Sequence, residues 1–487
     1  MVIEDKDLQS IQEVRNLIKK AKEAQKEFEK FSSERIDEII KEMAKVASRE
    51  AETLAKIAVE ETGFGKWQDK VMKNRLASEK LYQYIKDMKT LGIIREDHEK
   101  KIVEIGTPVG IVAGLIPSTN PTSTVIYKTI IALKAGNAII FSPHPSALKC
   151  IKKTVEILQK SAIEMGAPQG LIGCISIPTI EGTNELMKHD DISLILATGG
   201  SAMVKAAYSS GTPALGVGPG NTPTYIEKSA DIELAVKRII ASKTFDNGTI
   251  CASEQSIITD ECIKDQVKEE LIKRGGYFLT GDKLQKVIAI MERPTGGMNP
   301  KIVGKSAQDI AKMAGIEIPL GTKVLLCEEK GIGKKYPFSK EKLTTLLGFY
   351  TAKDWKEACE ISYELLENEG IGHTLAIHSN NEEIIREFAL RKPVSRFLVN
   401  TPASQGGTGL STNLAPAFTL GCGAVGGSAT SDNVTPMNLI NIRRMAYGVD
   451  DLGIQKEKDN KIKDVFSNVD IESITRLVLE QLKNIEK

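Results

Sequence analysis

Residues 137–176 read NAIIFSPHPSALKCIKKTVEILQKSAIEMGAPQGLIGCIS. Two short apolar runs, NAIIFS and LIGCIS, lie on either side of a stretch around residues 150–165 whose apolar positions recur with helical spacing. Parallel strands need a long crossover connection, which is usually a helix. The segment therefore predicts a βαβ unit, and with it an α/β protein built on a parallel sheet.

The same alternation extends in both directions. It continues through ISLILA and TPTYIE as far as residue 227, after a helical lead-in over residues 9–88. A second alternating region follows residue 230, with strands expected at SEQSIITD, KVLLCEE and HTLAIHS. We therefore expect two α/β domains, which suits a chain of 487 residues because single cores stop growing at roughly 250–300 residues.

The composition excludes several classes of function. Acidic and basic residues nearly cancel to a net charge of +1, which favours neither nucleic acid nor a membrane surface as a partner. No apolar run approaches the roughly 20 residues that span a bilayer, and the first residues lack the pattern of a secretory signal, so we expect a cytoplasmic protein. The seven cysteines are scattered without CxxC spacing, so reduced thiols and no metal site are expected.

One strand-to-helix junction is a candidate phosphate site. In ATGGSAMVKAA, a buried strand ends at Thr198, Gly199, Gly200 and Ser201, and a helix follows whose first amides would face an anion. The segment is not GxGxxG, and a glycine pair at such a junction is often only a tight turn. Both interpretations stay open on the residues alone.

One cysteine differs from the other six. In KTFDNGTICASEQSIITD, the turn signal Asp246, Asn247 and Gly248 separates a helix from a strand and places Cys251 on a loop. Thiols on loops are accessible to activation by nearby amides, whereas the other cysteines fall in patterns typical of core packing. Cys251 is therefore the candidate nucleophile.

Three motifs in order resemble one known family. GLIPSTNPTSTVIYKTIIALKAGNAIIFSPHP, GVGPGNTPTYIE and ICASEQS are similar to the CoA-acylating branch of the aldehyde dehydrogenase superfamily, the acetaldehyde and propionaldehyde dehydrogenases, over most of the chain as far as about residue 450. The resemblance implies an aldehyde dehydrogenase-like fold with two Rossmann-like α/β domains and a small β extension for oligomerisation. A homodimer or a dimer of dimers is expected.

The expected domain boundaries follow from the resemblance and from the composition. We predict a dinucleotide-binding domain with its N-terminal helices, two oligomerisation segments, a catalytic domain, a polar linker and a C-terminal helix. The dinucleotide-binding domain occupies residues 1–92 and 107–229, and the oligomerisation segments are residues 93–106 and 432–450. The catalytic domain occupies residues 230–431, the linker residues 451–469 and the C-terminal helix residues 470–487.

The resemblance also implies a reaction. Cys251 would attack the aldehyde carbon, and Asn120 with the Cys251 backbone N–H would hold the developing oxyanion, although an Asn between Thr and Pro is otherwise a common turn residue. Hydrolytic members carry a water-activating glutamate where this chain has Val217. The thioester on Cys251 is therefore expected to pass to coenzyme A, and reversibly.

The resemblance further implies cofactor contacts at the phosphate junction already described and at Ser142, Pro143 and His144, after the first strand of the βαβ unit. Many hydrolytic relatives have a lysine in this segment, so the choice between NAD and NADP is open. Glu341 matches a carboxylate that holds the nicotinamide ribose, but the proline that usually follows is Thr345 here, and as a bare sequence feature Glu341 resembles a surface acid. His373 is either a relay for the CoA proton or a structural histidine.

Residues 470–487 predict an amphipathic helix, with Ile471, Ile474, Val478, Leu482 and Ile485 at three- and four-residue spacing. Such a helix either docks on the enzyme itself or binds an external partner. On an acylating aldehyde dehydrogenase it is similar to the encapsulation peptides that bind shell proteins of bacterial microcompartments.

Three functions are compatible with these features. The first is an acylating dehydrogenase of short-chain aldehydes. The second is a hydrolytic semialdehyde dehydrogenase or an acyl-phosphate reductase on the same scaffold, which Val217 and ICASEQ disfavour. The third is a scaffold protein recruited through its C-terminal helix, which an intact Cys251 and Asn120 disfavour.

Overall fold

The computed structural model describes residues 4–293, 298–450, 452 and 470–485. Its contacts divide the chain into two units, Met1–Ile94 with Ile105–Arg443, and Arg95–Glu104 with Arg444–Lys487. The linker predicted over residues 451–469 lies outside the described residues, apart from Leu452.

A five-stranded parallel sheet contains the βαβ segment on which the prediction rests. The strands run in the order β5-β4-β3-β6-β7. Gly114 in β3 permits close packing, because a Cβ there would lie 2.6 Å from the ring of Phe141 in β4. The bounds are β3 Ile111–Ile116, β4 Ala138–Pro143, β5 Ile172–Cys174, β6 Ile192–Thr198 and β7 Ala214–Val217.

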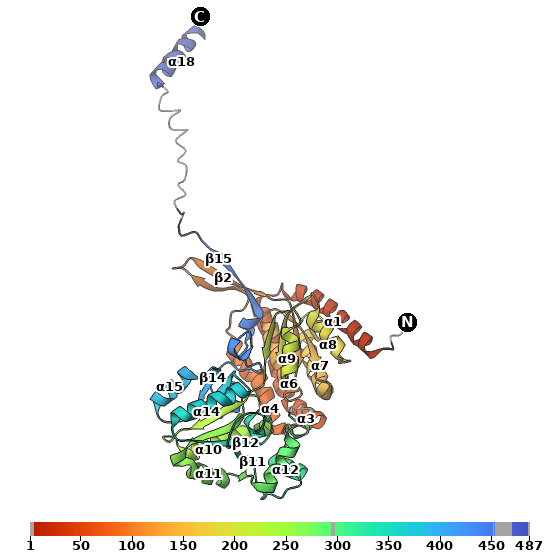
Figure 1. Ribbon diagram of the computed structural model, residues 1–487. Coiled ribbons are helices and arrows are strands. Elements are labelled where there is room, and N and C mark those ends of the chain that lie inside the picture. The colour runs from red at the N-terminus through yellow and green to blue at the C-terminus, as the bar shows by residue number, and fades with distance from the viewer. Residues whose placement is uncertain (1–3, 294–297, 451, 453–469, 486–487) are drawn as a thin grey trace. The chain divides into compact units, whose positions relative to one another are not determined.

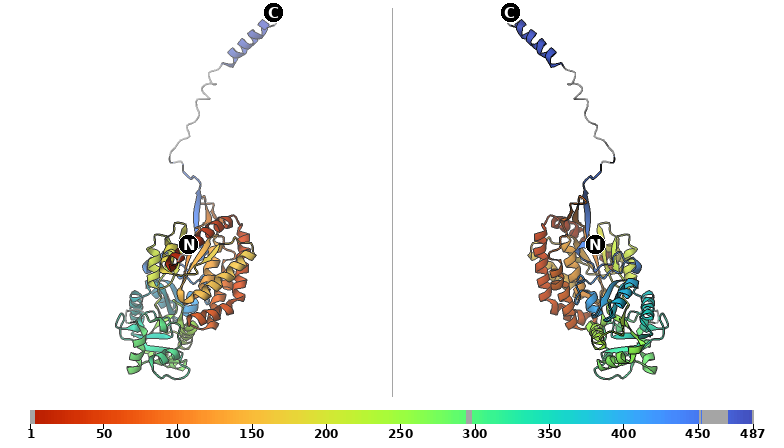
Figure 2. Two further views of the ribbon diagram at one scale, coloured as in Figure 1. Left: turned by 90° about the vertical axis from the view of Figure 1, so that its right-hand side faces the viewer. Right: turned by 90° about the vertical axis from the view of Figure 1, so that its left-hand side faces the viewer.

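The N-terminal helices and the crossover helices enclose this sheet. Helix α1 contacts α8 and three strands, and α2 contacts α6 and α7, so the red and yellow elements of Figures 1 and 2 lie side by side. Helix α6 is buried along its whole length. The bounds are α1 Lys6–Phe28, α2 Ser33–Arg49, α3 Ala51–Thr62, α4 Trp67–Arg75, α5 Leu81–Ile85, α6 Pro121–Lys134, α7 Leu148–Glu164, α8 Ile180–Lys188 and α9 Ser201–Tyr208.

A second, seven-stranded parallel sheet runs in the order β10-β11-β12-β9-β8-β13-β14. Neighbouring residues of its strands point to opposite faces, so Tyr225 and Ile258 pack with α14 and α15, while Ile226 and Ile257 pack with α10 and α11. The strand bounds are β8 Thr222–Ile226, β9 Glu254–Asp260, β10 Gly276–Phe278, β11 Val324–Glu328, β12 Leu346–Ala352, β13 Gly372–His378 and β14 Val394–Val399.

Helices cover both faces of this second sheet, as expected for a buried parallel sheet. The helix bounds are α10 Ile232–Thr244, α11 Lys264–Lys273, α12 Gly281–Met291, α13 Ala307–Ala314, α14 Trp355–Asn368, α15 Glu382–Arg391 and α16 Ala403–Gly407. The predicted α/β class with two parallel sheets is confirmed.

The remaining elements are a small sheet and the C-terminal helix. Strands β1 Gly92–Asp97, β2 Ile102–Pro108 and β15 Ile440–Ala446 form a three-stranded sheet with β2 in the centre (Figure 1). Helix α18 spans Ile471–Ile485. Among the described residues, none of the helices is both long and apolar enough to cross a membrane.

Candidate active site

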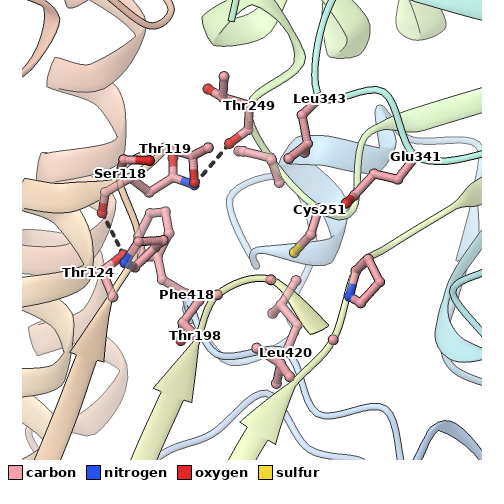
Figure 3. Close-up of a pocket in the computed structure, with 18 of the residues that line it drawn as sticks. Ser118, Thr119, Thr124, Thr198, Thr249, Cys251, Glu341, Leu343, Phe418 and Leu420 are labelled. Atoms are coloured by element: carbon pink, nitrogen blue, oxygen red, sulfur yellow. Dashed lines mark hydrogen bonds between the residues drawn. The ribbon is translucent and has the colours of Figure 1, made fainter. Parts of the chain in front are cut away.

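The candidate catalytic residues Cys251 and Asn120 line one pocket of about 210 Å³. Three parts of its lining lie at the carboxyl ends of strands of the five-stranded sheet. They are Asn120 after β3, Thr198 to Gly200 at the end of β6, and Val217 to Pro219 at the end of β7. The opposite side is the Cys251 loop with Glu341. In Figure 3 the Cys251 side chain points into the pocket, Glu341 points toward it, and Phe418 and Leu420 face them.

Cys251 lies on the predicted loop, between a short 3₁₀ turn at Phe245–Gly248 and β9. Asp246 and Asn247 in that turn adopt left-handed backbone conformations, with φ of 48° and 51°, which Asp and Asn tolerate better than most residues. Burial, followed by the negative charge of Glu341, raises the pKa of the Cys251 thiol to about 12, and the charge of Arg396 opposes this only in part. At neutral pH the thiol in this pocket is therefore protonated.

Asn120 occupies the N-cap position of α6 but does not cap the helix. Its side chain instead donates from Nδ2 to the neighbouring Thr119 Oγ1 at 3.3 Å, and makes two further contacts that bridge different parts of the fold. Nδ2 donates to the Thr249 carbonyl at 2.9 Å, and Oδ1 accepts from Lys73 Nζ at 2.6 Å. The carboxamide is thus held beside the Cys251 loop, as an oxyanion donor must be.

A buried ion cluster, formed by Lys70, Lys73 and Asp246, lies behind Asn120. Both lysines are on α4, and both donate to Asp246 Oδ2, Lys70 at 2.8 Å. Thr249 Oγ1 donates to the same carboxylate oxygen at 2.7 Å. The cluster connects α4 to the turn that carries Cys251.

The sequence did not reveal the two lysines as site residues. Helix α4 buries Lys70, Lys73 and Asn74, so its inward face is polar. In sequence such residues are indistinguishable from a solvated helix surface, because Lys is almost never fully buried unless it is paired. The signal in the sequence is the absence of an apolar stripe over residues 67–75, which indicates that the inward face of this helix is polar.

Glu341 is part of the pocket wall and not the surface acid that the bare sequence suggests. Its Oε1 accepts from the Gly220 backbone N–H at 2.9 Å. Burial and then the negative charge of Glu369 raise the pKa of Glu341 to about 8. Glu341 is the one acid among the residues that line this pocket.

A second cavity, of about 450 Å³, adjoins the Cys251 pocket and shares Pro117, His144, Thr198 and Gly199 with it. Ser142 and Pro143 line it as well, so the predicted cofactor segments come together there. Gly200 lines the Cys251 pocket, whereas Ser201 lines neither cavity.

These two cavities fit an elongated dinucleotide. Apolar side chains of Ile180, Met187 and Met203 suit a flat base, and the cavity extends toward the phosphate junction before α9. A Cβ at Gly200 would meet no atom within 4 Å, so the glycine leaves that space to a ligand.

His373 is buried at the start of β13 and is not among the residues that line the Cys251 pocket. Its Nδ1 is 2.8 Å from Thr374 Oγ1, and its Nε2 is without a partner among the described residues. Burial and the charge of Arg396 lower its pKa well below the usual value, so the ring is neutral.

No three His, Cys, Asp or Glu side chains gather as metal ligands anywhere in the part of the chain that the structure describes.

Comparisons with known proteins agree with this fold. Residues 2–329 match the model of the Aldehyde dehydrogenase family. The chain is 46% identical over 442 residues to the bifunctional aldehyde-alcohol dehydrogenase of Escherichia coli K12; the match covers 90% of this chain and 50% of that protein. The chain thus spans about half the length of this curated relative.

Two solved structures extend the comparison. The acetylating aldehyde dehydrogenase from Geobacillus thermoglucosidasius is similar with a TM-score of 0.91 and 55% identity, over 93% of this chain and all of that one. A propionaldehyde dehydrogenase from the fucose utilisation bacterial microcompartment of Clostridium phytofermentans is similar with a TM-score of 0.81 and 29% identity, over 89% and 97% of the two chains. The resemblance predicted from the motifs is therefore confirmed: this chain belongs to the aldehyde dehydrogenase family.

Proposed function

We propose that the protein oxidises a short-chain aldehyde to its acyl-CoA, with Cys251 as the covalent nucleophile. The observation that carries this proposal is the pairing of Cys251 and Asn120 in one pocket whose wall has the apolar Val217. The relative from Geobacillus thermoglucosidasius, named an acetylating aldehyde dehydrogenase, supports the same reaction class.

In the first step the Cys251 sulfur attacks the aldehyde carbon, and the thiol loses its proton as the carbonyl oxygen becomes an oxyanion. Asn120 Nδ2 and the Cys251 backbone N–H serve as the donors to that oxyanion. One preorganised donor of this kind lowers the barrier by about 3–4 kcal/mol. Because burial keeps the thiol protonated, proton loss is part of the cost of this step.

NAD or NADP, when bound, supplies the hydride acceptor. The residues that would hold it are Ser142, Pro143 and His144 at one end, Thr198 to Gly200 at the phosphates, and Glu341 at the ribose beside Cys251. Loss of hydride from the thiohemiacetal carbon leaves a thioester on Cys251.

The thioester then waits for a thiol, because the apolar Val217 stands where the resemblance places the water-activating glutamate of hydrolytic members. Glu341, with its pKa raised to about 8, is mostly protonated at neutral pH. The CoA sulfur attacks the acyl carbon, the carbon–sulfur bond to Cys251 breaks, and the proton of the CoA thiol is released as Cys251 recovers its own. One thioester replaces another, so the step is nearly isoenergetic and the reaction runs in both directions.

The test is a comparison of products with and without CoA. Purified protein is incubated with acetaldehyde or propionaldehyde and NAD or NADP, and acyl-CoA, free acid and reduced nicotinamide are measured. We expect acyl-CoA and reduced cofactor in equal amounts, and no turnover by Cys251→Ala. Equally fast oxidation without CoA, with free acid as product, would show the hydrolytic alternative instead.

A small pocket supports short aldehydes as substrates. The Cys251 pocket of about 210 Å³ must also admit the nicotinamide end of the cofactor, so little space remains for the aldehyde, and Phe418 and Leu420 are apolar residues of its lining. This matches an aldehyde that carries a small alkyl group better than one with a charged chain.

We further propose a homodimer or dimer of dimers, assembled through the three-stranded sheet. Strand β15 is an edge of that sheet, and its residues from Asn441 to Ala446 are exposed. Edge strands readily pair with another chain when they are uncovered.

We also propose that α18 binds a microcompartment shell protein. Ile474, Leu477, Val478 and Leu482 are each more than half exposed and share one region of the helix surface. An apolar helix face of this kind docks into a groove on a partner. The relative from a Clostridium phytofermentans microcompartment supports the shell as that partner.

A further inference from the structure

The orientation of the Asn120 carboxamide decides whether it helps or hinders an oxyanion. Its nitrogen carries two N–H donors, whereas its oxygen is only an acceptor. If the Asn120 nitrogen faces the pocket, the carboxamide stabilises a negative charge in the pocket. If the oxygen faces the pocket, the carboxamide repels that charge. An Asn carboxamide can adopt either of two orientations, and its hydrogen-bond partners determine which one it adopts.

Two partners set this orientation from opposite sides. Lys73 Nζ has only donors, so the atom 2.6 Å away must be the carboxamide oxygen. The Thr249 carbonyl is only an acceptor, so the atom 2.9 Å from it must be the nitrogen. Reversing the carboxamide would place donor against donor and acceptor against acceptor.

Lys73 in turn has little freedom to move. It is buried, it donates to Asp246 and to Thr249 Oγ1 at 3.2 Å, and the ring of Phe245 lies 5.7 Å from its ammonium. Two buried lysines share the buried carboxylate of Asp246, and the partly exposed Asp69 accepts from the Asp246 backbone N–H at 2.8 Å. The Lys73 ammonium of this cluster lies directly against Asn120 Oδ1.

We propose that Lys73 is a positioning residue for Asn120: its ammonium holds the carboxamide with Nδ2 toward the Cys251 pocket and polarises it into a stronger oxyanion donor. This inference rests on the proposed function, because it requires an oxyanion to form at Cys251. A cation against the oxygen draws electron density from the nitrogen and strengthens the N–H donor.

Lys70 provides a matched control. It lies one turn earlier on α4, is equally buried and donates to the same Asp246 oxygen, but its other bond goes to the Thr119 carbonyl at 2.9 Å and not to the Asn120 side chain. Lys70→Met and Lys73→Met therefore break the same ion cluster, and only the second releases the carboxamide.

The experiment measures kcat and KM for aldehyde, with CoA and NAD saturating, in Lys73→Met, Lys70→Met, Asn120→Ala and the double variant of residues 73 and 120. We expect Lys73→Met to lower kcat about 10²-fold, as the loss of an oxyanion donor does, with little change in KM. Lys70→Met should lower kcat by less than about tenfold, because it costs stability and not donor geometry. In the Asn120→Ala background, Lys73→Met should cause no further loss of kcat, since the two residues act as one unit.

Equal losses of kcat in the two lysine variants, or losses that multiply in the double variant, would overturn the inference. If Lys73→Met does not fold, Lys73→Gln serves instead, because its carboxamide still donates to Asn120 Oδ1 and should retain more kcat than Lys73→Ala; the same kcat in both would also overturn it. A normal kcat in Asn120→Ala would refute the oxyanion role in the proposed function itself.

Discussion

At the residue scale, the Cys251 thiol is held in its protonated form. Its pKa of about 12 leaves little thiolate at neutral pH, and only the thiolate reacts with alkylating agents. We therefore predict that the rate of Cys251 alkylation by iodoacetamide increases continuously from pH 7 to pH 10. Peptide mass spectrometry, with the exposed Cys262 as internal reference, measures the rate.

Glu341 provides the companion test. Its negative charge raises the pKa of Cys251, and it ionises near pH 8, so Glu341→Gln should increase Cys251 alkylation above about pH 8 and change it little below. An alkylation rate that is already constant below pH 8 would show a thiolate at neutral pH and contradict this assignment.

The wall residue Val217 decides the fate of the thioester in the proposed mechanism. Val217 lines the pocket, and Val217→Glu would place a carboxylate where the resemblance implies that hydrolytic members carry theirs. General bases typically contribute about 10²–10⁴-fold, so free acid should form without CoA at a rate well above that of the parent protein. Val217→Gln, of nearly the same size and without a basic oxygen, is the control and should not form acid.

At the scale of elements, the segment after β7 packs tightly on the nucleophile loop. A Cβ at Gly220 would lie 1.9 Å from the Cys251 carbonyl oxygen, whereas a Cβ at Gly218 would meet no atom within 4 Å. Gly220→Ala must therefore displace the Cys251 loop or the segment itself.

We predict that Gly220→Ala lowers the free energy of unfolding by about 1–3 kcal/mol, as overpacking does. Gly218→Ala should change it by less than about 0.5 kcal/mol, as expected where no contact is strained. Denaturant titration of the two variants checks both values. Equal stability of both would mean that the segment relaxes freely around the added methyl group.

Helix α4 shows why the presence of helices is easier to predict than the role of one helix. A helical lead-in was expected over residues 9–88, and helices α1 to α5 lie there. The inward face of α4 is nevertheless polar, because Lys70 and Lys73 pair with Asp246, more than 170 positions away in the chain. Local periodicity contains no information about such a partner.

At the scale of the whole molecule, the proposed shell contact belongs to α18 alone. A chain that ends at residue 450 should therefore keep its activity and lose co-purification with shell proteins, as should the pair Leu477→Glu and Val478→Glu, which adds charge to exposed apolar positions. Arg476→Glu, on the polar side of the helix, is the control for charge. Unchanged association of the truncated chain with shell proteins would contradict the proposal.

The sequence by itself determined the α/β class, the family and the loop position of Cys251. Strand and helix periodicity, turn residues and the order of three motifs are properties of neighbouring residues, and the structure and the comparisons confirm what they predicted about the fold and the family. The proximity of Asn120 to Cys251, expected from the resemblance, also appears in the pocket.

Only the tertiary structure decided the electrostatics of that pocket. The raised pKa values of Cys251 and Glu341, and the ion cluster that holds Asn120, arise because folding removes water and brings together charges from distant parts of the chain. Glu341 and Lys73 look in sequence like solvated surface charges. Burial gives them their role, and burial is a property of the packed fold.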